Sequence, residues 1–207
     1  MVARSDPGAR TRRSSSEIRA LILTAARDVF SERGYAGAST RELAARAGVA
    51  EHLLFRNFGT KAKLFEEAVF VPFEAFISAY SRVWSSRDAD GPMTDIALEY
   101  VAGLYDFLHA NRLMISVLLA TRAHEPEFDM RLQQLFGQME VMINEGITER
   151  HFPGVDPALA ARLTFGLVLS AAVHQEVLFP LGPPTTREEL LSELTQYMLH
   201  GLAHRGE

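Results

Sequence analysis

Apolar residues recur every three or four positions along most of the chain, which is the spacing of helices with one buried face. In the segment that follows Ser14, for example, Ile18, Ile22, Ala25 and Val29 fall on one side of a helix. No run of alternating β-branched residues is bounded by turn signals, as a β-strand would be. The pattern therefore predicts an all-α chain with about nine helices.

Capping residues and glycines place the ends of the first helices. A capping box, Ser14-x-x-Glu17, opens the first helix, and Gly34 is expected to end it. A second box that begins at Ser39 opens a short helix, which Gly48 closes. Another short helix is expected over 50–57, and a longer one after it. Two short helices joined by a glycine turn predict a helix-turn-helix within a three-helix unit.

The rest of the chain is expected to form an antiparallel helical bundle. The longer helix starts at Lys61 and must pass Pro72, which lacks a backbone N–H and should kink or split the helix near Val71. The polar, Gly- and Pro-bearing stretch 85–92 predicts a loop. The helices expected after it cover 93–110, 113–121, 128–150, 156–179 and 187–200.

Charge divides the chain into two parts of opposite sign. Residues 1–65 hold 12 Lys+Arg against 6 Asp+Glu, a charge of +6, whereas residues 66–207 hold 9 against 20, a charge of −11. A basic head on an acidic body indicates a nucleic-acid partner for the head. For the first dozen residues, with Arg4, Arg10, Arg12 and Arg13 close by, a solvated arginine-rich tail is the alternative.

Composition excludes several classes of protein. The chain has 207 residues, 47% of them hydrophobic, and no cysteine, so disulfide scaffolds and thiolate metal sites drop out. No apolar run reaches the roughly 18 residues of a membrane span, and no secretory signal is recognisable. We expect a cytoplasmic protein that makes no membrane contact.

The helix-turn-helix segment has a specific likeness. The string Thr40-Arg-Glu-Leu-Ala-Ala-Arg-Ala-Gly-Val49 and the string Leu-Leu-Phe-Arg-Asn-Phe-Gly-Thr-Lys at 53–61 resemble the TetR family of one-component transcriptional regulators over residues 17–69. The resemblance implies a flexible arm over 1–15, a helix-turn-helix DNA-binding domain over 16–66, and a ligand-binding and dimerisation domain over 67–207. It further implies a homodimeric repressor that a small apolar ligand releases from a palindromic operator.

The resemblance also implies which residues bind double-stranded DNA. The helix over 50–57 would lie in the major groove with its exposed side chains at base edges, and other side chains would anchor phosphates. Ala50 and Phe55 stand where related sequences usually show Ser and Tyr, and Phe55 is expected to pack instead of contacting DNA. The base-reading candidates are Glu51, His52, Leu53 and Arg56, and the phosphate-binding candidates are Ser39, Thr40, Asn57 and Lys61.

Aromatic residues and methionines gather in the acidic body, where the resemblance implies a ligand-binding core. Ordinary core packing is the alternative for each of them. The sequence His174-Gln175-Glu176 lies late in the helix expected over 156–179. That helix is rich in small residues, which favours a subunit seam formed with the last helix. The ligand-binding candidates are Phe73, Phe76, Tyr80, Tyr100, Tyr105, Met114, Met139, Met142, Phe165 and His174.

Two rival interpretations stay open. One is a constitutive DNA-binding dimer that takes no inducer, and the other is a small helical enzyme. His200-x-x-x-His204 has metal-ligand spacing but lies at the end of the sequence, and His124 lacks a second histidine placed to complete a site. No phosphate loop, nucleophile elbow or HExxH string occurs. We therefore expect no catalytic site, no metal and no cofactor.

Overall fold

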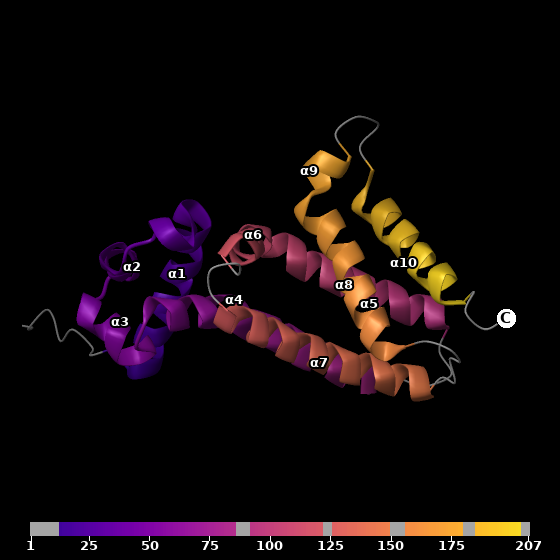
Figure 1. Ribbon diagram of the computed structural model, residues 1–207, viewed down its shortest axis with the longest axis horizontal. Helices are drawn as coiled ribbons and strands as arrows, with labels where there is room; N and C mark the ends of the chain where they lie inside the picture. Colours follow the sequence, from indigo (N-terminus) through magenta and orange to yellow (C-terminus); the bar gives the residue numbers. More distant parts are fainter. Residues whose placement is uncertain (1–12, 86–91, 122–125, 150–155, 180–184, 204–207) are drawn as a thin grey trace, which may run out of the picture. The chain divides into compact units, whose positions relative to one another are not determined.

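The chain folds into helices, and the all-α prediction is confirmed. The computed structural model describes residues 13–85, 92–121, 126–149, 156–179 and 185–203. Ten helices and no strand lie within these ranges (Figure 1), close to the expected number of about nine. The chain divides into two compact units, the first ending at Ala68 and the second beginning at Val69. The arginines at positions 4, 10 and 12 lie outside the described residues.

Four helical segments build the first unit. They are α1 (Ser15–Gly37), α2 (Thr40–Ala47), α3 (Glu51–Phe58) and the beginning of α4 (Lys61–Ser85). Each contributes apolar side chains to one core, since a helix with one apolar face must bury that face against its neighbours. The largest of these buried side chains are Ile22, Phe30, Leu43, Leu54, Leu64 and Phe65.

Local capping begins the helices as the sequence indicates. The Ser14 hydroxyl accepts from the Glu17 amide at 3.1 Å, and the Glu17 carboxylate accepts from the Ser14 amide at 2.6 Å. The bounds of α1 reach Gly37, but the helix has a break at Gly34, where its end was expected. Gly34 itself has φ 69° and ψ 173°, so the helical path is interrupted there by the one residue type that adopts this backbone at low cost.

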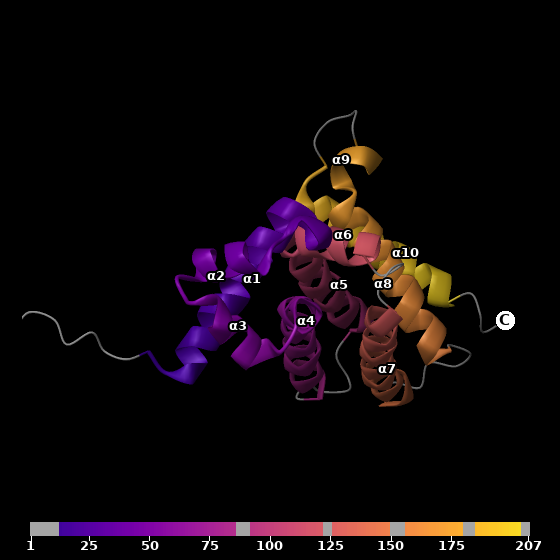
Figure 2. The same cartoon turned by 60° about the vertical axis from the view of Figure 1, so that its left-hand side comes forward.

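The second unit is a bundle around α8 (Pro157–Val173), which contacts α5 (Met93–Ala110), α7 (Pro126–Glu149) and α10 (Arg187–Ala203), as Figure 2 helps to follow. The short helices α6 (Arg112–Thr121) and α9 (Gln175–Leu178) also contact α8. Within the described ranges, no helix is both long and apolar enough to cross a bilayer.

Two helices of the second unit differ from the expectation in part. A kink or a split was expected at Pro72, and the split is excluded because α4 runs through Pro72 as a single helix. Phe70 and Phe73 are buried on either side, and their packing outweighs the lost hydrogen bond. The single helix expected over 156–179 breaks at His174, which has φ −109° and ψ 22°. Residues 174–179 bury no face, so packing does not favour a continuous helix there.

Candidate nucleic-acid interface

A left-handed glycine sets the angle between α2 and α3. Gly48 has φ 63° and ψ 38°, and its amide donates to the Ala45 carbonyl at 3.1 Å while the Val49 amide donates to the Ala44 carbonyl at 3.0 Å. The Gly48 carbonyl accepts from Nη1 of Arg13 at 3.3 Å. The turn thus satisfies the last carbonyls of α2 and starts α3 in a new direction.

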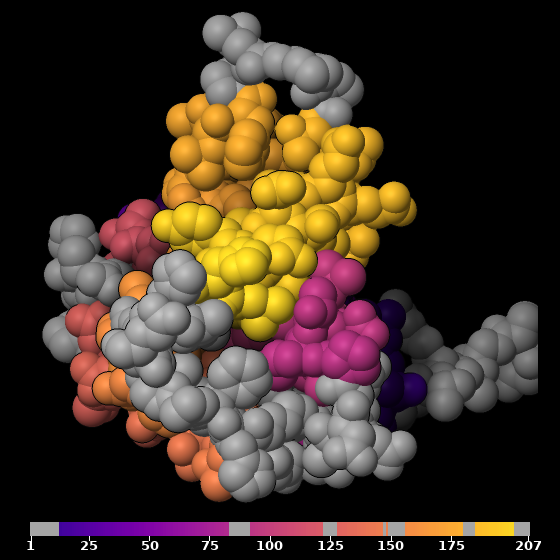
Figure 3. Space-filling view, turned by 90° about the vertical axis from the view of Figure 1, so that its right-hand side faces the viewer, coloured from indigo at the N-terminus to yellow at the C-terminus, as the bar shows by residue number. Residues whose placement is uncertain are grey.

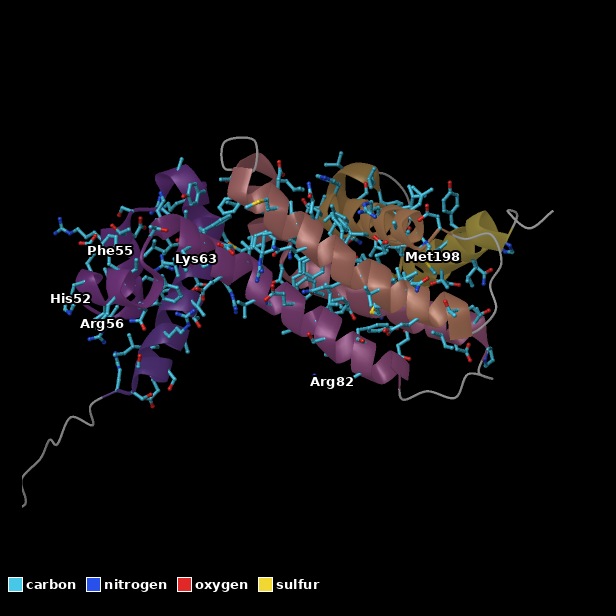
Figure 4. The ribbon with its side chains drawn as sticks, turned by 60° about the horizontal axis from the view of Figure 1, so that its bottom comes forward. His52, Phe55, Arg56, Lys63, Arg82 and Met198 are labelled. Carbon is cyan, nitrogen blue, oxygen red and sulfur yellow. The ribbon has the colours of Figure 1, made fainter. Side chains whose placement is uncertain are left out.

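The helix α3 is divided between a buried side and an exposed side. Leu54 and Phe58 are buried against the core, whereas His52, Phe55 and Arg56 are exposed. At about 100° per residue, His52 and Arg56 lie one turn apart and form an outward ridge. Figure 4 shows these three side chains on α3, remote from Lys63 of α4. Among the described residues, neither His52 nor Arg56 has a hydrogen-bond or ion-pair partner.

Glu51 and Thr40, two of the DNA-binding candidates, are joined to each other. The Thr40 hydroxyl donates to Oε1 of Glu51 at 2.6 Å and so ties the start of α2 to the start of α3. The Ser39 hydroxyl accepts from the Glu42 amide at 3.1 Å as the cap of α2. The pair Thr40–Glu51 therefore fixes how the two short helices meet, and a spacing of 11 residues in the sequence gave no sign of it.

Asn57 and Lys61 are also bound within the domain. Nδ2 of Asn57 donates to the Leu53 carbonyl at 2.7 Å. Nζ of Lys61 donates to the carbonyls of Tyr35 at 2.8 Å and of Ala38 at 3.0 Å, and lies 4.5 Å from the centre of the Tyr35 ring. These contacts give Lys61 a structural role between α1 and α4, besides the phosphate contact that stays a prediction.

The expectation for Phe55 was wrong. Its side chain is 46% exposed and does not pack into the core, where Leu54 and Phe58 take up the inward side of α3. Leu53, which the sequence marked as a base-reading candidate, is half-buried. The periodicity of an eight-residue helix is too short to tell which of several apolar residues faces the core.

Several arginines elsewhere in the first unit are engaged in ion pairs. Arg46 forms a two-point pair with Glu32 at 3.0 and 2.9 Å, and this hydrogen-bonded contact lowers the pKa of Glu32 and raises that of Arg46. Arg19 pairs with Glu67, donates to the Asn57 carbonyl at 2.9 Å and lies over the Phe58 ring. Sequence reasoning missed these partners, because they come from distant positions in the chain.

The ligand-binding candidates of the second unit fall into two groups. Two candidates are not buried: Phe76 is half-buried, and His174 is exposed at the end of α8. Burial raises the pKa of Tyr100, a fully enclosed phenol. The candidates that are buried are Phe73, Tyr80, Tyr100, Tyr105, Met114, Met139, Met142 and Phe165.

Phenyl rings from four helices meet inside this unit. The ring of Phe73 lies 5.1 Å from that of Phe107 and 5.6 Å from that of Phe165, and Phe136 meets Phe165 edge-on at 5.1 Å. Phe76 stacks on Phe107 at 5.0 Å. We call these five residues the phenyl cluster; it joins α4, α5, α7 and α8.

Polar contacts surround the break at His174. The Tyr105 hydroxyl donates to Oε1 of Gln175 at 3.0 Å, and Nδ1 of His109 lies 3.3 Å from the Ala172 carbonyl. Partial burial is the main cause of the raised pKa of Tyr105. Gln175 thus has a partner within the subunit, whereas His174 and Glu176 are exposed. Within the part of the chain that the structure describes, no cluster of potential metal ligands occurs.

A basic domain that presents one exposed helix across a glycine turn defines the class of helix-turn-helix regulatory proteins. The family model described as bacterial regulatory proteins, tetR family, matches residues 22–68. The transcriptional regulator YezE of Bacillus subtilis is 30% identical over 130 residues, which cover 62% of this chain and 67% of that protein. The chain belongs to the TetR family of bacterial regulatory proteins, as the sequence indicated.

Other relatives match in part or in fold alone. An HTH-type transcriptional repressor of Mycobacterium tuberculosis is 54% identical over 48 residues, so the match covers 23% of this chain and only 26% of the length of that repressor. The crystal structure of the regulator FadR from Bacillus subtilis, in complex with stearoyl-CoA, has a TM-score of 0.67 at 18% identity, over 91% of this chain and 99% of that one.

Proposed function

We propose that this protein is a homodimeric transcriptional repressor that binds an inverted-repeat operator and leaves it when a small apolar ligand binds the second unit. The observation that carries the proposal is the outward ridge of His52 and Arg56 on α3, which the Gly48 turn presents without partners among the described residues. An arginine fork free to reach guanine O6 and N7 is the commonest base-specific contact. The mycobacterial relative is a transcriptional repressor, which supports repression as the direction of control.

The proposal is tested with a pool of random duplexes. The purified protein is mixed with the pool at about 0.1 M salt, and retarded duplexes are selected over several rounds. We expect enrichment of a sequence with two related half-sites about one or a few helical turns apart, because a two-fold dimer presents two recognition helices. If no sequence is enriched, the proposed function is wrong.

Exposed apolar side chains on α8, α9 and α10 support the dimer. Leu159 and Leu163 lie on one side of α8 together with the exposed Gly166, and 57% of Leu163 is exposed. Val177 of α9 and Tyr197 of α10 are 74% and 73% exposed. Figure 3 shows α10 in yellow at the surface beside the orange α8 and α9. Such a set of apolar residues is typical of a subunit interface.

A charge placed on this surface tests the dimer. We expect Leu163→Glu to give a monomer in analytical ultracentrifugation and to weaken operator binding, because two carboxylates would be buried at the seam. Met130→Glu on α7, where the side chain is also largely exposed, is the matched control and should stay dimeric. If the Leu163→Glu protein remains a dimer, the dimer interface does not include this surface.

The phenyl cluster supports an apolar ligand. Its rings come from four helices, and all five of its members are phenylalanines, so the cluster favours a hydrocarbon over a charged group. FadR, which shares the fold, was crystallised with stearoyl-CoA. We therefore take stearoyl-CoA as the first probe.

Ligand control is tested by stability and by DNA release. A ligand at about 100 times its dissociation constant stabilises the folded state by about 2.7 kcal/mol, which raises the thermal midpoint by several degrees. We expect stearoyl-CoA to raise the midpoint and to release the selected duplex. If a series of acyl chains from eight to about eighteen carbons does neither, the alternative of a dimer without inducer is favoured.

A further inference from the structure

Phe55 presents an exposed phenyl ring on the helix that carries the base-reading candidates. Its side chain is 46% exposed, and it makes no ring contact with the residues that the structure describes. Other large aromatic side chains of this domain, such as Phe30, Phe58 and Phe65, are buried. The stability of the domain therefore does not account for a phenyl ring at this position.

The position of Phe55 on α3 places it beside the ridge of His52 and Arg56. At about 100° per residue, Phe55 lies about 60° around the helix from His52 and about 100° from Arg56. Along the axis of a helix, consecutive residues advance by only about 1.5 Å, less than the about 3.4 Å of one base-pair step. Phe55 and Arg56 can thus reach the same or neighbouring base pairs.

The flank of α3 that holds Phe55 also holds Glu51, one turn earlier. Oε1 of Glu51 accepts from the Thr40 hydroxyl at 2.6 Å, so this flank is fixed against the beginning of α2. Phe55 therefore lies between the outward ridge and the start of α2, on a helix held in place at both ends. A ring in this position would lie within the major groove, beside the edges of the base pairs.

The chemistry of a phenyl ring limits what it can recognise there. It donates no hydrogen bond to a phosphate oxygen or to a base edge, so a polar contact is excluded. The major-groove edges of the base pairs offer one apolar group, the 5-methyl of thymine. We infer that Phe55 is a specificity-determining residue that packs on a thymine 5-methyl, next to or at the base pair read by Arg56. The inference rests on the proposed DNA-binding function.

The test removes the methyl group and leaves everything else in place. In the duplex selected from the random pool, each thymine is replaced singly by deoxyuridine, and affinities are measured by fluorescence anisotropy. A buried methyl contributes about 0.8 kcal/mol, or about fourfold in affinity for each methyl removed. We expect the wild type to lose about fourfold at one position per half-site, within about one base pair of the position whose preference changes in Arg56→Ala.

Variants of the side chain assign the effect to Phe55. Phe55→Ala should bind the thymine and deoxyuridine duplexes equally, while Phe55→Leu should keep part of the difference. Leu21→Ala is the control, since it removes a partly exposed apolar side chain from α1 of the same domain and should keep the full fourfold difference. Thermal melts of all three variants check that the domain remains folded.

Three results would overturn the inference. In the first, the wild type binds every deoxyuridine duplex as well as the thymine duplex, which would leave the phenyl ring against deoxyribose or away from the DNA. In the second, Phe55→Ala keeps the fourfold difference, which would assign the methyl contact to another residue such as Leu53. In the third, no duplex is enriched, and then the proposed function fails as well; the first two results leave that function intact.

Discussion

Replacing Arg56 by alanine should relax base preference without disturbing the fold. The Arg56 side chain is exposed and has no partner among the described residues, so its loss breaks no contact within the domain. A bidentate contact to guanine contributes about 1–3 kcal/mol, and a dimer makes two of them. At the lower limit the loss is about 2 kcal/mol, or roughly 30-fold in affinity for the selected duplex.

Arg46→Ala is the matched control for this change. It removes the same charge from the same domain, but its guanidinium is already held by Glu32 at 3.0 and 2.9 Å and is not free to read a base. We expect Arg46→Ala to change affinity for the selected duplex and for an unrelated duplex by the same small factor. Arg56→Ala should lower the first much more than the second.

The assay is fluorescence anisotropy with both duplexes at two salt concentrations. The quantity that decides is the ratio of the two affinities, because charge loss alone weakens both duplexes alike. If Arg56→Ala retains the ratio of the wild type, or if both variants lower it equally, Arg56 does not read a base. The outward ridge on α3 would then have to act through phosphates alone.

Further predictions concern the backbone and its caps. Gly48→Ala should lower the unfolding free energy by about 1 kcal/mol because of the φ of 63°, whereas Gly137→Ala on α7, with nothing within 4 Å, should raise it; equal effects would contradict the strain. The Ser14 amide and hydroxyl lower the pKa of Glu17 below 4.5, so the charged carboxylate stabilises the fold at pH 7 and this stabilisation is lost in acid. In urea titrations, Glu17→Gln should therefore lower the unfolding free energy at pH 7 and have the unfolding free energy of the wild type near pH 3. A difference that persists at low pH would exclude this cause. Pro72→Ala should raise the thermal midpoint, since it restores an N–H within α4; an unchanged or lowered midpoint would contradict this reason.

Local signals predicted most of the helices correctly, because a cap acts within a few residues. Ser14 and Ser39 begin α1 and α2 as their capping boxes indicate, and Gly48 closes α2 in the left-handed conformation. Likewise the string 40–49 was sufficient to suggest the family. Pro72 was harder to interpret, since the cost of a proline within a helix is local but the packing that compensates for it is not.

The sequence predicted which residues belong to the candidate site, but not which partners their side chains have within the domain. Thr40, Asn57 and Lys61 were expected at phosphates, and each side chain has its partner within the domain. The Lys61 ammonium contacts a carbonyl 26 residues earlier, at Tyr35, and no periodicity announces such a contact. Exposure of Phe55 likewise depends on which apolar residues of α3 fit the core.

The sequence by itself determined the helical class, the start of each capped helix, the basic head and the family, because these follow from local spacing, capping and charge. The tertiary structure decided which side chains are free to meet a partner. Whether Arg56 or Arg46 remains unpaired, whether Phe55 faces solvent, and whether the chain breaks at His174 depend on contacts between helices far apart in the sequence. Such contacts exist only once the chain has folded and the cores are filled.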